Sequence, residues 1–170
     1  NFGCGNDIRK GWVNADFIKR DGIDVVHNFN KYPYPFRTNT FDYIECVEVL
    51  EHLNDSIETV RELHRILKPG GQVKITAPYY LSYHAWSNPE HKRAFNFQTF
   101  KYFIAGTAEN KAHNLGITFS SGKIKMTTGG GKYVINHVMQ PLLNLWPDLF
   151  ERTFLRAVFH PDGITAILTK

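Results

Sequence analysis

Residues 41–78, FDYIECVEVLEHLNDSIETVRELHRILKPGGQVKITAP, carry the pattern of a strand, a helix and a second strand. Residues 41–47 are mostly β-prone, residues 55–67 repeat apolar side chains at helical spacing, and residues 72–78 alternate apolar and polar side chains. A strand, a crossover helix and a strand in this order almost always form a right-handed parallel pair. The sequence therefore predicts an α/β fold built on a mostly parallel sheet.

Both ends of the helix are marked in the sequence. Asp55 and Glu58 stand three residues apart ahead of the apolar run, which predicts a capping box. Lys68 and Pro69 are followed by two glycines, and this order of a cation, a helix breaker and residues that accept a left-handed backbone is typical of a helix end. We therefore expect one helix over residues 55–67.

The size and composition of the chain predict a single domain. It has 170 residues, of which 42% are hydrophobic, enough for one full core. It contains no run of about eighteen apolar residues, so we expect no membrane span. Cys4 and Cys46 form neither a disulfide framework nor a CxxC motif, which predicts no metal site and a reducing, cytoplasmic location. Residues 1–3 read as the end of a strand, so we expect a further segment before them.

The charge is distributed unevenly. Residues 1–85 hold ten Lys and Arg against eleven Asp and Glu, whereas residues 86–170 hold ten against five. The net positive charge of +4 therefore comes from the second half. Two interpretations stay open: a basic surface that only aids solubility, or a half that meets an anionic substrate.

The first residues carry a motif for a nucleotide-type ligand. NFGCG reads as a strand end and a glycine turn, where open α/β sheets bind cofactors, although a tight turn without a ligand has the same pattern. Asp16 ends a second short strand and is placed to bind ribose hydroxyls. A nicotinamide site needs a third glycine, a helix and an acid about twenty residues further on. Asp16 follows Gly5 by only eleven residues, which disfavours a dehydrogenase.

A third strand is expected over residues 23–28. Its end presents Asn28, whose amide is able to bind an adenine amino group, and Phe29, whose ring is able to lie along the base.

Five motifs together resemble the class I S-adenosylmethionine-dependent methyltransferases: NFGCG, VNAD, HNFNKYPYPF, FDYIECVEVLEHL and LKPGGQVKITAP. The resemblance covers residues 1 to about 80 and continues more loosely into HKRAFNFQTF. It implies a three-layer Rossmann-like fold with a mostly parallel seven-stranded sheet of order 3-2-1-4-5-7-6, the last strand antiparallel. It also implies a cofactor half over about residues 1–80 and an acceptor half over about residues 79–160.

The resemblance further implies S-adenosylmethionine as the cofactor and assigns its contacts. These are Gly3, Cys4 and Gly5 around the methionine part, Asp16 at the ribose, Phe17, Asn28 and Phe29 at the adenine, and Cys46, Val47 and Glu48 at the sulfonium side. Two features depart from the family pattern. The helix that usually follows the glycine turn is shortened here, and Asn28 stands where the family commonly has Asp.

The segment after Pro78 predicts the methyl-acceptor side. Residues 79–103 contain nine aromatic residues, and residues 79–89 follow no helix or strand period, which predicts a loop at the cofactor edge of the sheet. We expect Tyr79, Tyr80 and Trp86 to line the acceptor pocket, although a hydrophobic cover over the sheet explains the same aromatics. Lys92 and Arg93 are expected to bind an anionic group of the acceptor, against the alternative of two solvated charges.

Two histidines are candidate proton acceptors. Methyl transfer is an in-line displacement, and a base is needed only where the acceptor must lose a proton. His91 and His84 lie on the predicted pocket segment, and imidazole takes up a proton near neutral pH. The Glu51-His52 pair is instead expected to cap and pack the following helix, while Glu45 needs a partner if it is buried.

The remaining elements are predicted as follows. A helix starts at Asn96, a sixth strand lies within residues 117–127, residues 128–132 form a linker, residues 133–146 form a helix kinked or divided at Pro141, and residues 164–168 form the last strand.

The sequence thus predicts an enzyme that transfers the sulfonium methyl group to an O or N atom of a small molecule or a cell-surface precursor, leaving S-adenosylhomocysteine. A non-catalytic nucleotide-binding protein of the same fold is the alternative, and an NAD-type oxidoreductase is less favoured. Nucleic-acid methylation stays open because the second half is basic, but no recognition motif supports it.

Overall fold

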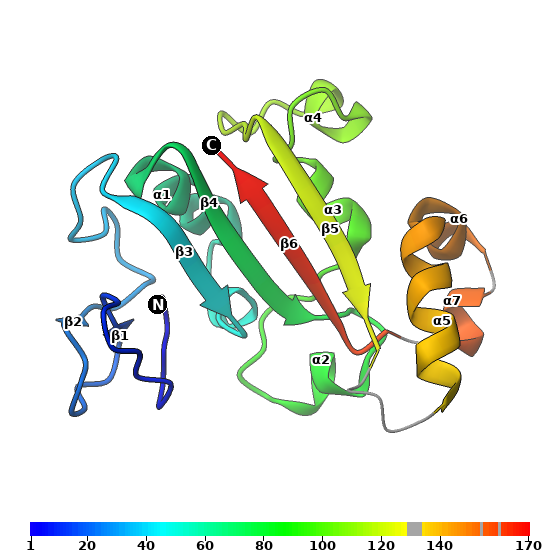
Figure 1. The fold of residues 1–170 in the computed structure, drawn as a ribbon, viewed down its shortest axis with the longest axis horizontal. Coiled ribbons are helices and arrows are strands. Elements are labelled where there is room, and N and C mark those ends of the chain that lie inside the picture. The colour runs from blue at the N-terminus through cyan, green and yellow to red at the C-terminus, as the bar shows by residue number, and fades with distance from the viewer. Residues whose placement is uncertain (129–133, 154, 160) are drawn as a thin grey trace.

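The computed structural model describes residues 1–128, 134–153, 155–159 and 161–170. It has the expected α/β fold, with four long strands side by side in a twisted sheet (Figure 1). These strands lie in the order β3, β4, β6 and β5. Their bounds are Phe41–Val47 for β3, Leu67–Pro78 for β4, Ser121–Thr127 for β5 and Gly163–Thr169 for β6.

The neighbouring strands β3 and β4 are parallel, as residues 41–78 predict, with Ile44 opposite Val73 and Cys46 opposite Ile75. By contrast, β6 runs antiparallel to both of its neighbours, β4 and β5. The last of the described strands is therefore inserted into the sheet rather than added at its edge.

Two short strands, β1 (Ala15–Asp16) and β2 (Val25–Val26), form a separate parallel pair. Phe2 connects this pair to the main sheet through single parallel bridges to Ala15 and Cys46. Phe2 thus pairs like a strand residue at the position where the sequence predicts the end of a strand.

The expected helix between β3 and β4 is α1 (Ser56–Ile66). Its N-cap is Asp55, whose carboxylate accepts hydrogen bonds from the amides of Ile57 at 3.0 Å and Glu58 at 2.9 Å. Glu58 does not complete the predicted capping box, because its side chain pairs with Arg61. Cap hydrogen bonds of this kind fix where the helix begins.

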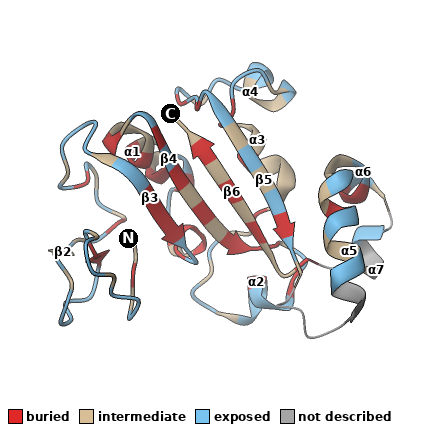
Figure 2. Cartoon of the chain, in the orientation of Figure 1, coloured by how far each residue is buried: buried red, intermediate tan, exposed pale blue. Residues whose placement is uncertain are grey.

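The main core lies between one face of the sheet and α1. Burial alternates along the strands, so that Figure 2 shows red and tan segments in turn on β4 and β6. The buried face presents Val73 and Ile75 of β4 and Ile164 of β6, which belong to one cluster with Val60 and Leu63 of α1. The opposite face carries polar side chains such as Lys74 and Thr76, only half-buried.

This layering differs from the three-layer expectation. Among the described residues, the segments before β3 contain turns and short strands but no helix, whereas α1 and α3 (Phe97–Lys101) lie behind the sheet in Figure 1. The segment between Gly5 and Trp12 is too short for a crossover helix, as the sequence indicates. Glu45 on the polar face finds the partners it needs there, since its carboxylate pairs with Arg9 and Lys74.

The second half contains short helices. A loop is predicted over residues 79–89, but α2 (Tyr83–Ser87) forms there because the Ser82 hydroxyl accepts a hydrogen bond from the amide of Ala85 at 3.2 Å. Asn96 caps α3 as predicted, with a reciprocal capping box to Thr99. The next helix is α4 (Ala108–Ala112).

Near the free edge of β5 lie α5 (Val134–Leu145), α6 (Pro147–Arg152) and α7 (Leu155–Val158) (Figure 1). Pro141 is predicted to kink or divide its helix; it does not divide α5, which continues through it as one element. Most of the predicted linker, residues 129–132, lies outside the described residues. No helix among the described ranges is long and apolar enough to cross a membrane.

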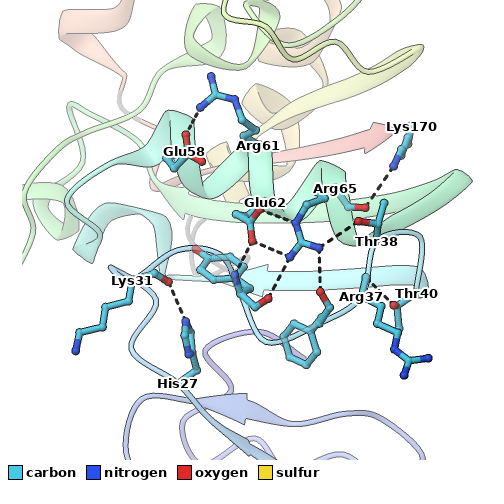
Figure 3. A network of polar contacts seen from close by, with 12 residues as sticks. His27, Lys31, Arg37, Thr38, Thr40, Glu58, Arg61, Glu62, Arg65 and Lys170 are labelled. Carbon is cyan, nitrogen blue, oxygen red and sulfur yellow. Dashed lines mark hydrogen bonds and ion pairs between the residues drawn. The ribbon is translucent and has the colours of Figure 1, made fainter.

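A polar network holds α1 against the loop that precedes β3 (Figure 3). Glu62 accepts hydrogen bonds from the Tyr34 amide at 2.6 Å and from Arg65 Nε at 2.6 Å. Arg65 in turn donates to the carbonyls of Tyr34 and Phe36 at 3.1 and 2.9 Å. Burial acts to raise the pKa of Glu62, but the Arg65 guanidinium and the Tyr34 amide outweigh it and hold that pKa below its usual value.

Candidate active site

A cavity of about 720 Å³ opens where β1, β2 and β3 end. Ligands of open α/β sheets bind at this carboxyl edge of the strands. The lining residues come from the first half of the chain and from residues 89–92: Gly3, Gly5, Asp16, Phe17, Arg20, Asn28, Phe29, Asn30, Glu48, Val49, His52, Leu53, Pro89, Glu90 and Lys92.

The glycine turn forms one wall of this cavity. Gly3 has a φ of +67°, and a Cβ atom there would lie 2.4 Å from Cγ2 of Val49, so only glycine fits. Gly5 has a φ of +54° but faces open space, since a Cβ atom at this residue would have no neighbour within 4 Å. The turn therefore brings backbone to the cavity at Gly5. Cys4 between them is buried, and burial raises the pKa of its thiol.

Asp16 is a buried carboxylate at the tip of β1, only 4% exposed. One of its oxygens accepts a hydrogen bond from the Gly5 amide at 2.8 Å, and the other accepts from the Ile18 amide at 2.9 Å. Arg20 lies 3.5 Å from the carboxylate. Each carboxylate oxygen has a second lone pair, so both can still accept a hydrogen bond from a ligand hydroxyl.

The predicted adenine contacts take different positions. Phe17 is 65% exposed beside the cavity, which leaves its ring free to cover a flat ligand. Asn28 is exposed, and its side-chain oxygen accepts from the Asn30 amide at 3.0 Å. Phe29 is only 3% exposed because its ring packs on Phe2, with centroids 3.9 Å apart.

At the end of β3, the structure brings Glu48 to the cavity but not Cys46 or Val47. Cys46 is fully buried, and this burial raises the pKa of its thiol. Glu48 has a φ of +53°, a left-handed conformation that a non-glycine residue adopts at some cost in free energy. The turn that it creates directs Val49 toward Gly3, so the strained residue shapes the cavity.

The predicted acceptor residues do not gather in one place. Tyr79 is fully buried, and its hydroxyl donates to Glu151 at 2.9 Å within a second cluster formed with Met126, Leu143 and Phe150. It therefore belongs to the hydrophobic cover rather than to the cavity wall. Trp86 is 63% exposed and donates its indole N–H to the Tyr80 carbonyl at 2.9 Å, and neither of these residues lines the cavity.

The two predicted cations diverge as well. Lys92 lines the cavity, and its ammonium donates to the side-chain oxygen of Asn54 at 2.7 Å. Arg93 points to a different cavity of about 470 Å³, where it donates to the Ser56 hydroxyl at 3.0 Å and to the Asn54 carbonyl. Only Lys92 of this pair is placed to meet a group bound beside Glu48.

Of the predicted bases, His84 is exposed on α2 and does not line the cavity. Burial raises the pKa of the Glu48 carboxyl. The His91 side chain is 7% exposed and shares a hydrogen bond of 3.0 Å between Nδ1 and the Ala85 carbonyl. His91 does not line the cavity, but His52 does, with its ring centroid 4.6 Å from that of His91.

Glu51 lies close to His52 and His91. It lies with His52 in the 3-10 helix η1 (Leu50–His52), is 1% exposed, and its carboxylate is 4.0 Å from Nε2 of His91. Burial raises the pKa of Glu51 to about 8. The sequence predicts a capping and packing role for this pair, whereas the Asp55 side chain caps α1. The cluster joins residues about forty positions apart, which no local spacing reveals.

Six residues that the sequence patterns do not single out also line the cavity: Arg20, Asn30, Val49, Leu53, Pro89 and Glu90. Each lies within a few residues of a predicted contact. Their only sequence signal is this adjacency to predicted contacts.

Part of this chain is similar to known methyltransferases. Residues 3–75 match a family model described as a methyltransferase domain. A demethylmenaquinone methyltransferase from Listeria welshimeri is 37% identical over 51 residues, which are 30% of this chain and 21% of that protein. A ubiquinone biosynthesis O-methyltransferase from Pseudomonas paraeruginosa is 52% identical over 33 residues, which are 19% of this chain and 14% of that protein. The matched part thus spans about a fifth or less of the length of these curated relatives.

Solved structures share the fold across most of the chain. A SAM-dependent methyltransferase from Archaeoglobus fulgidus superposes with a TM-score of 0.55 at 17% identity, covering 86% of this chain and 66% of that one. A possible histamine N-methyltransferase from Thermotoga maritima gives a TM-score of 0.52 at 15% identity, covering 88% of this chain and 65% of that one. Together these comparisons show that residues 3–75, less than half of the chain, are similar to a methyltransferase domain, and that the chain shares the fold of S-adenosylmethionine-dependent methyltransferases of known structure.

Proposed function

We propose that this chain binds S-adenosylmethionine in the 720 Å³ cavity and transfers its methyl group to an O or N atom of a small-molecule or cell-surface-precursor acceptor. The observation that carries the proposal is the meeting of Gly5, Asp16 and Phe17 in one cavity inside the segment that matches the methyltransferase model. When bound, the cofactor supplies an electrophilic methyl group on a positively charged sulfur.

The donor residues fit such a ligand. Gly5 faces open space where a side chain would occupy the cavity, so it leaves room for the methionine part. Asp16 is held by two backbone amides and keeps lone pairs for the ribose hydroxyls. Phe17 and Asn28 are the exposed groups for the adenine, and Glu48 lies at the end of β3 for the sulfonium side. Cys46 and Val47 do not line the cavity, so we assign them no contact with the cofactor.

The acceptor side is proposed to include Lys92 and His84. Lys92 supplies a cation beside Glu48 and suits an acceptor that carries an anionic group. His84 is exposed on α2, and we assign to it the removal of a proton from an acceptor that must lose one. His91 is directed toward Glu51 and is assigned to that cluster. The rate would come mainly from alignment of the acceptor atom and exclusion of water.

The open cavity favours an enzyme over a binding protein of the same fold. Residues 89, 90 and 92 form part of the wall and leave about 720 Å³ unfilled. The short turn after Gly5 and the position of Asp16 disfavour a nicotinamide enzyme, since no helix follows the glycine turn in the described residues 1–14.

The test is calorimetric titration of the full-length protein with S-adenosylhomocysteine. We expect saturable binding with about one site, and a loss on the order of 100-fold for Asp16→Ala, because the variant removes the ribose acceptor and the partner of the Gly5 amide. Asp24→Ala is the matched control, since Asp24 bonds to the Asn14 amide outside the cavity. Absence of binding, or equal binding by the Asp16 variant, would overturn the proposal. A methyl-labelled cofactor offered to metabolite extracts then identifies the acceptor.

A further inference from the structure

We propose that Glu51, His52 and His91 form a binding site for one divalent transition-metal cation at the wall of the cavity. Each side chain offers one ligand atom, and these three atoms lie within 4.8 Å of one another. The inference rests on the proposed function only for the role of the cation, not for its binding. It differs from the sequence analysis, which predicts no metal.

The carboxylate of Glu51 is the first reason. It is 1% exposed, and neither of its oxygens has a hydrogen-bond partner among the described residues. A buried carboxyl group whose oxygens have no hydrogen-bond partner costs free energy, so folds normally pair such a group or use it to bind a cation. The nearest groups are the imidazole of His91, at 4.0 Å from Nε2, and the carboxylate of Glu48, which repels it.

The orientation of His91 is the second reason. Its Nδ1 is 3.0 Å from the Ala85 carbonyl, which can only accept, so Nδ1 carries the proton. Nε2 of the neutral ring is then a lone pair turned toward Glu51. An imidazole that donates through one nitrogen to a carbonyl and offers the other as a ligand is the usual arrangement at metal sites. A structural role for His91 would need only the first of these contacts.

The ligand types select the cation. Two imidazoles and one carboxylate suit Zn²⁺, Fe²⁺, Mn²⁺ or Co²⁺, whereas Mg²⁺ prefers oxygen ligands. A cation about 2.1 Å from each atom needs ligand atoms about 3 to 3.5 Å apart. Atoms as far apart as 4.8 Å must therefore approach one another by about 1.3 to 1.8 Å. Glu51 and His52 are neighbours on η1, and the amide of Lys92, next to His91, donates to the Glu51 carbonyl at 2.8 Å. A backbone hydrogen bond thus already joins η1 to the segment that carries His91.

The position of the proposed site beside the cavity suggests what the cation would do. His52 lines the cavity, so a cation held with it lies at the cavity wall near Glu48. Such a cation would act as a Lewis acid: it would bind an oxygen or nitrogen of the acceptor and lower the pKa of the proton there, which then passes to His84. Three protein ligands leave coordination positions for the acceptor.

The experiment uses the full-length protein, stripped with a chelator and titrated with Zn²⁺ and with Co²⁺. We expect one cation per chain, and a visible Co²⁺ spectrum without a thiolate charge-transfer band, since the proposed ligands are nitrogen and oxygen. Glu51→Gln and His91→Ala should each weaken binding on the order of 100-fold. His113→Ala is the matched control, because His113 is exposed beyond α4. Mg²⁺ should bind far more weakly.

Thermal unfolding of each stripped variant separates loss of the site from loss of the fold. A folded Glu51→Gln protein that binds Zn²⁺ as tightly as the wild type overturns the inference, as does a stripped wild type without a saturable site. Titration of the same samples with S-adenosylhomocysteine keeps the two proposals apart. Cofactor binding without metal binding refutes only the metal site, and metal binding without cofactor binding refutes only the methyltransferase proposal.

Discussion

The tip of β1 and the 3-10 helix η1 each bring a buried carboxylate to the region of the cavity, and the fold treats the two differently. Asp16 is 4% exposed and has a backbone amide on each oxygen. Glu51 is 1% exposed and has no hydrogen-bond partner among the described residues. The carboxylate on the proposed donor side therefore has its partners within the chain, whereas the one on the proposed acceptor side has none among the described residues.

This difference separates two kinds of site. A carboxylate satisfied by amides is fixed in place before any ligand arrives, so its contribution to binding is geometric. A carboxylate without partners costs stability in the ligand-free protein, and that cost is offset only by a cation or a proton. The donor side should therefore be sensitive to backbone changes, and the acceptor side to the ions present.

Gly3→Ala is expected to have the largest effect on stability, because it distorts the glycine turn that forms one wall of the cavity. A Cβ at residue 3 meets the side chain of Val49 at 2.4 Å, and φ is +67°. The left-handed conformation costs about 1 to 2 kcal/mol and the overpacking a similar amount, so we expect a loss of about 3 kcal/mol in the free energy of unfolding. Urea denaturation measures it.

Gly5→Ala is the control for this substitution. It has a similar φ of +54° but no atom within 4 Å of the new Cβ, so only the backbone cost of about 1 kcal/mol should appear. Equal losses for the two variants would show that the contact with Val49 does not decide the turn.

The second prediction compares the two carboxylates directly. Asp16→Asn turns one acceptor oxygen into a donor and leaves the amide of Gly5 or Ile18 without a partner, which should cost about 2 kcal/mol. Glu51→Gln removes no hydrogen bond, so the stripped protein should lose less than about 0.5 kcal/mol or gain stability. Chemical denaturation at pH 7 with a chelator present measures both. A larger loss for Glu51→Gln would mean that Glu51 is satisfied in solution.

Glu62 is a third buried carboxylate, and the smallest effect on stability is expected there. The pKa of Glu62 is lowered in the folded protein, so the folded state releases this proton more readily than the unfolded chain. The stabilisation is complete above the usual value of 4.5 and is lost as the pH falls through the lower folded pKa. Glu62→Gln should cost about 1 kcal/mol at pH 7 and nothing at the lowest pH. Urea denaturation across this range measures the difference.

Glu58→Gln provides the matched control on the same helix. Its pair with Arg61 is partly exposed, with 31% and 43% of the two side chains accessible, so the change should lie within about 0.5 kcal/mol at every pH. A pH-dependent loss at Glu58 as large as at Glu62 would contradict the role given to burial.

The sequence predicts the parts of the fold that local chemistry determines. The strand Phe41–Val47, the caps Asp55 and Asn96, and the paired state of Glu45 depend on nearby residues or on a simple burial argument. The continuous course of α5 through Pro141 escapes such a prediction, because local propensity alone favours a break there. The same limit applies to the short α2, whose five residues are too few to show a helical period.

In the candidate site, too, local motifs are predictable from the sequence and long-range contacts are not. Gly5, Asp16 and Phe17 lie within twelve residues of one another, so their motif carries the prediction. Tyr79 looks like a pocket residue in an aromatic segment, yet Met126 and Leu143, far along the chain, cover it. The relation between Glu51 and His91 depends on the meeting of η1 with the turn after α2. Only the folded chain reveals such long-range contacts.

The position of β6 has a consequence for how the protein is made. Residues 163–169 pair with β4 on one side and β5 on the other, and they leave the ribosome after every other described strand. Until then β4 and β5 have no common neighbour, and one edge of β4 presents unpaired backbone N–H and C=O groups. Assembly of the sheet should therefore be late and slow, since it waits for a contact of long sequence separation. A nascent chain arrested before residue 163 would be a natural client for chaperones.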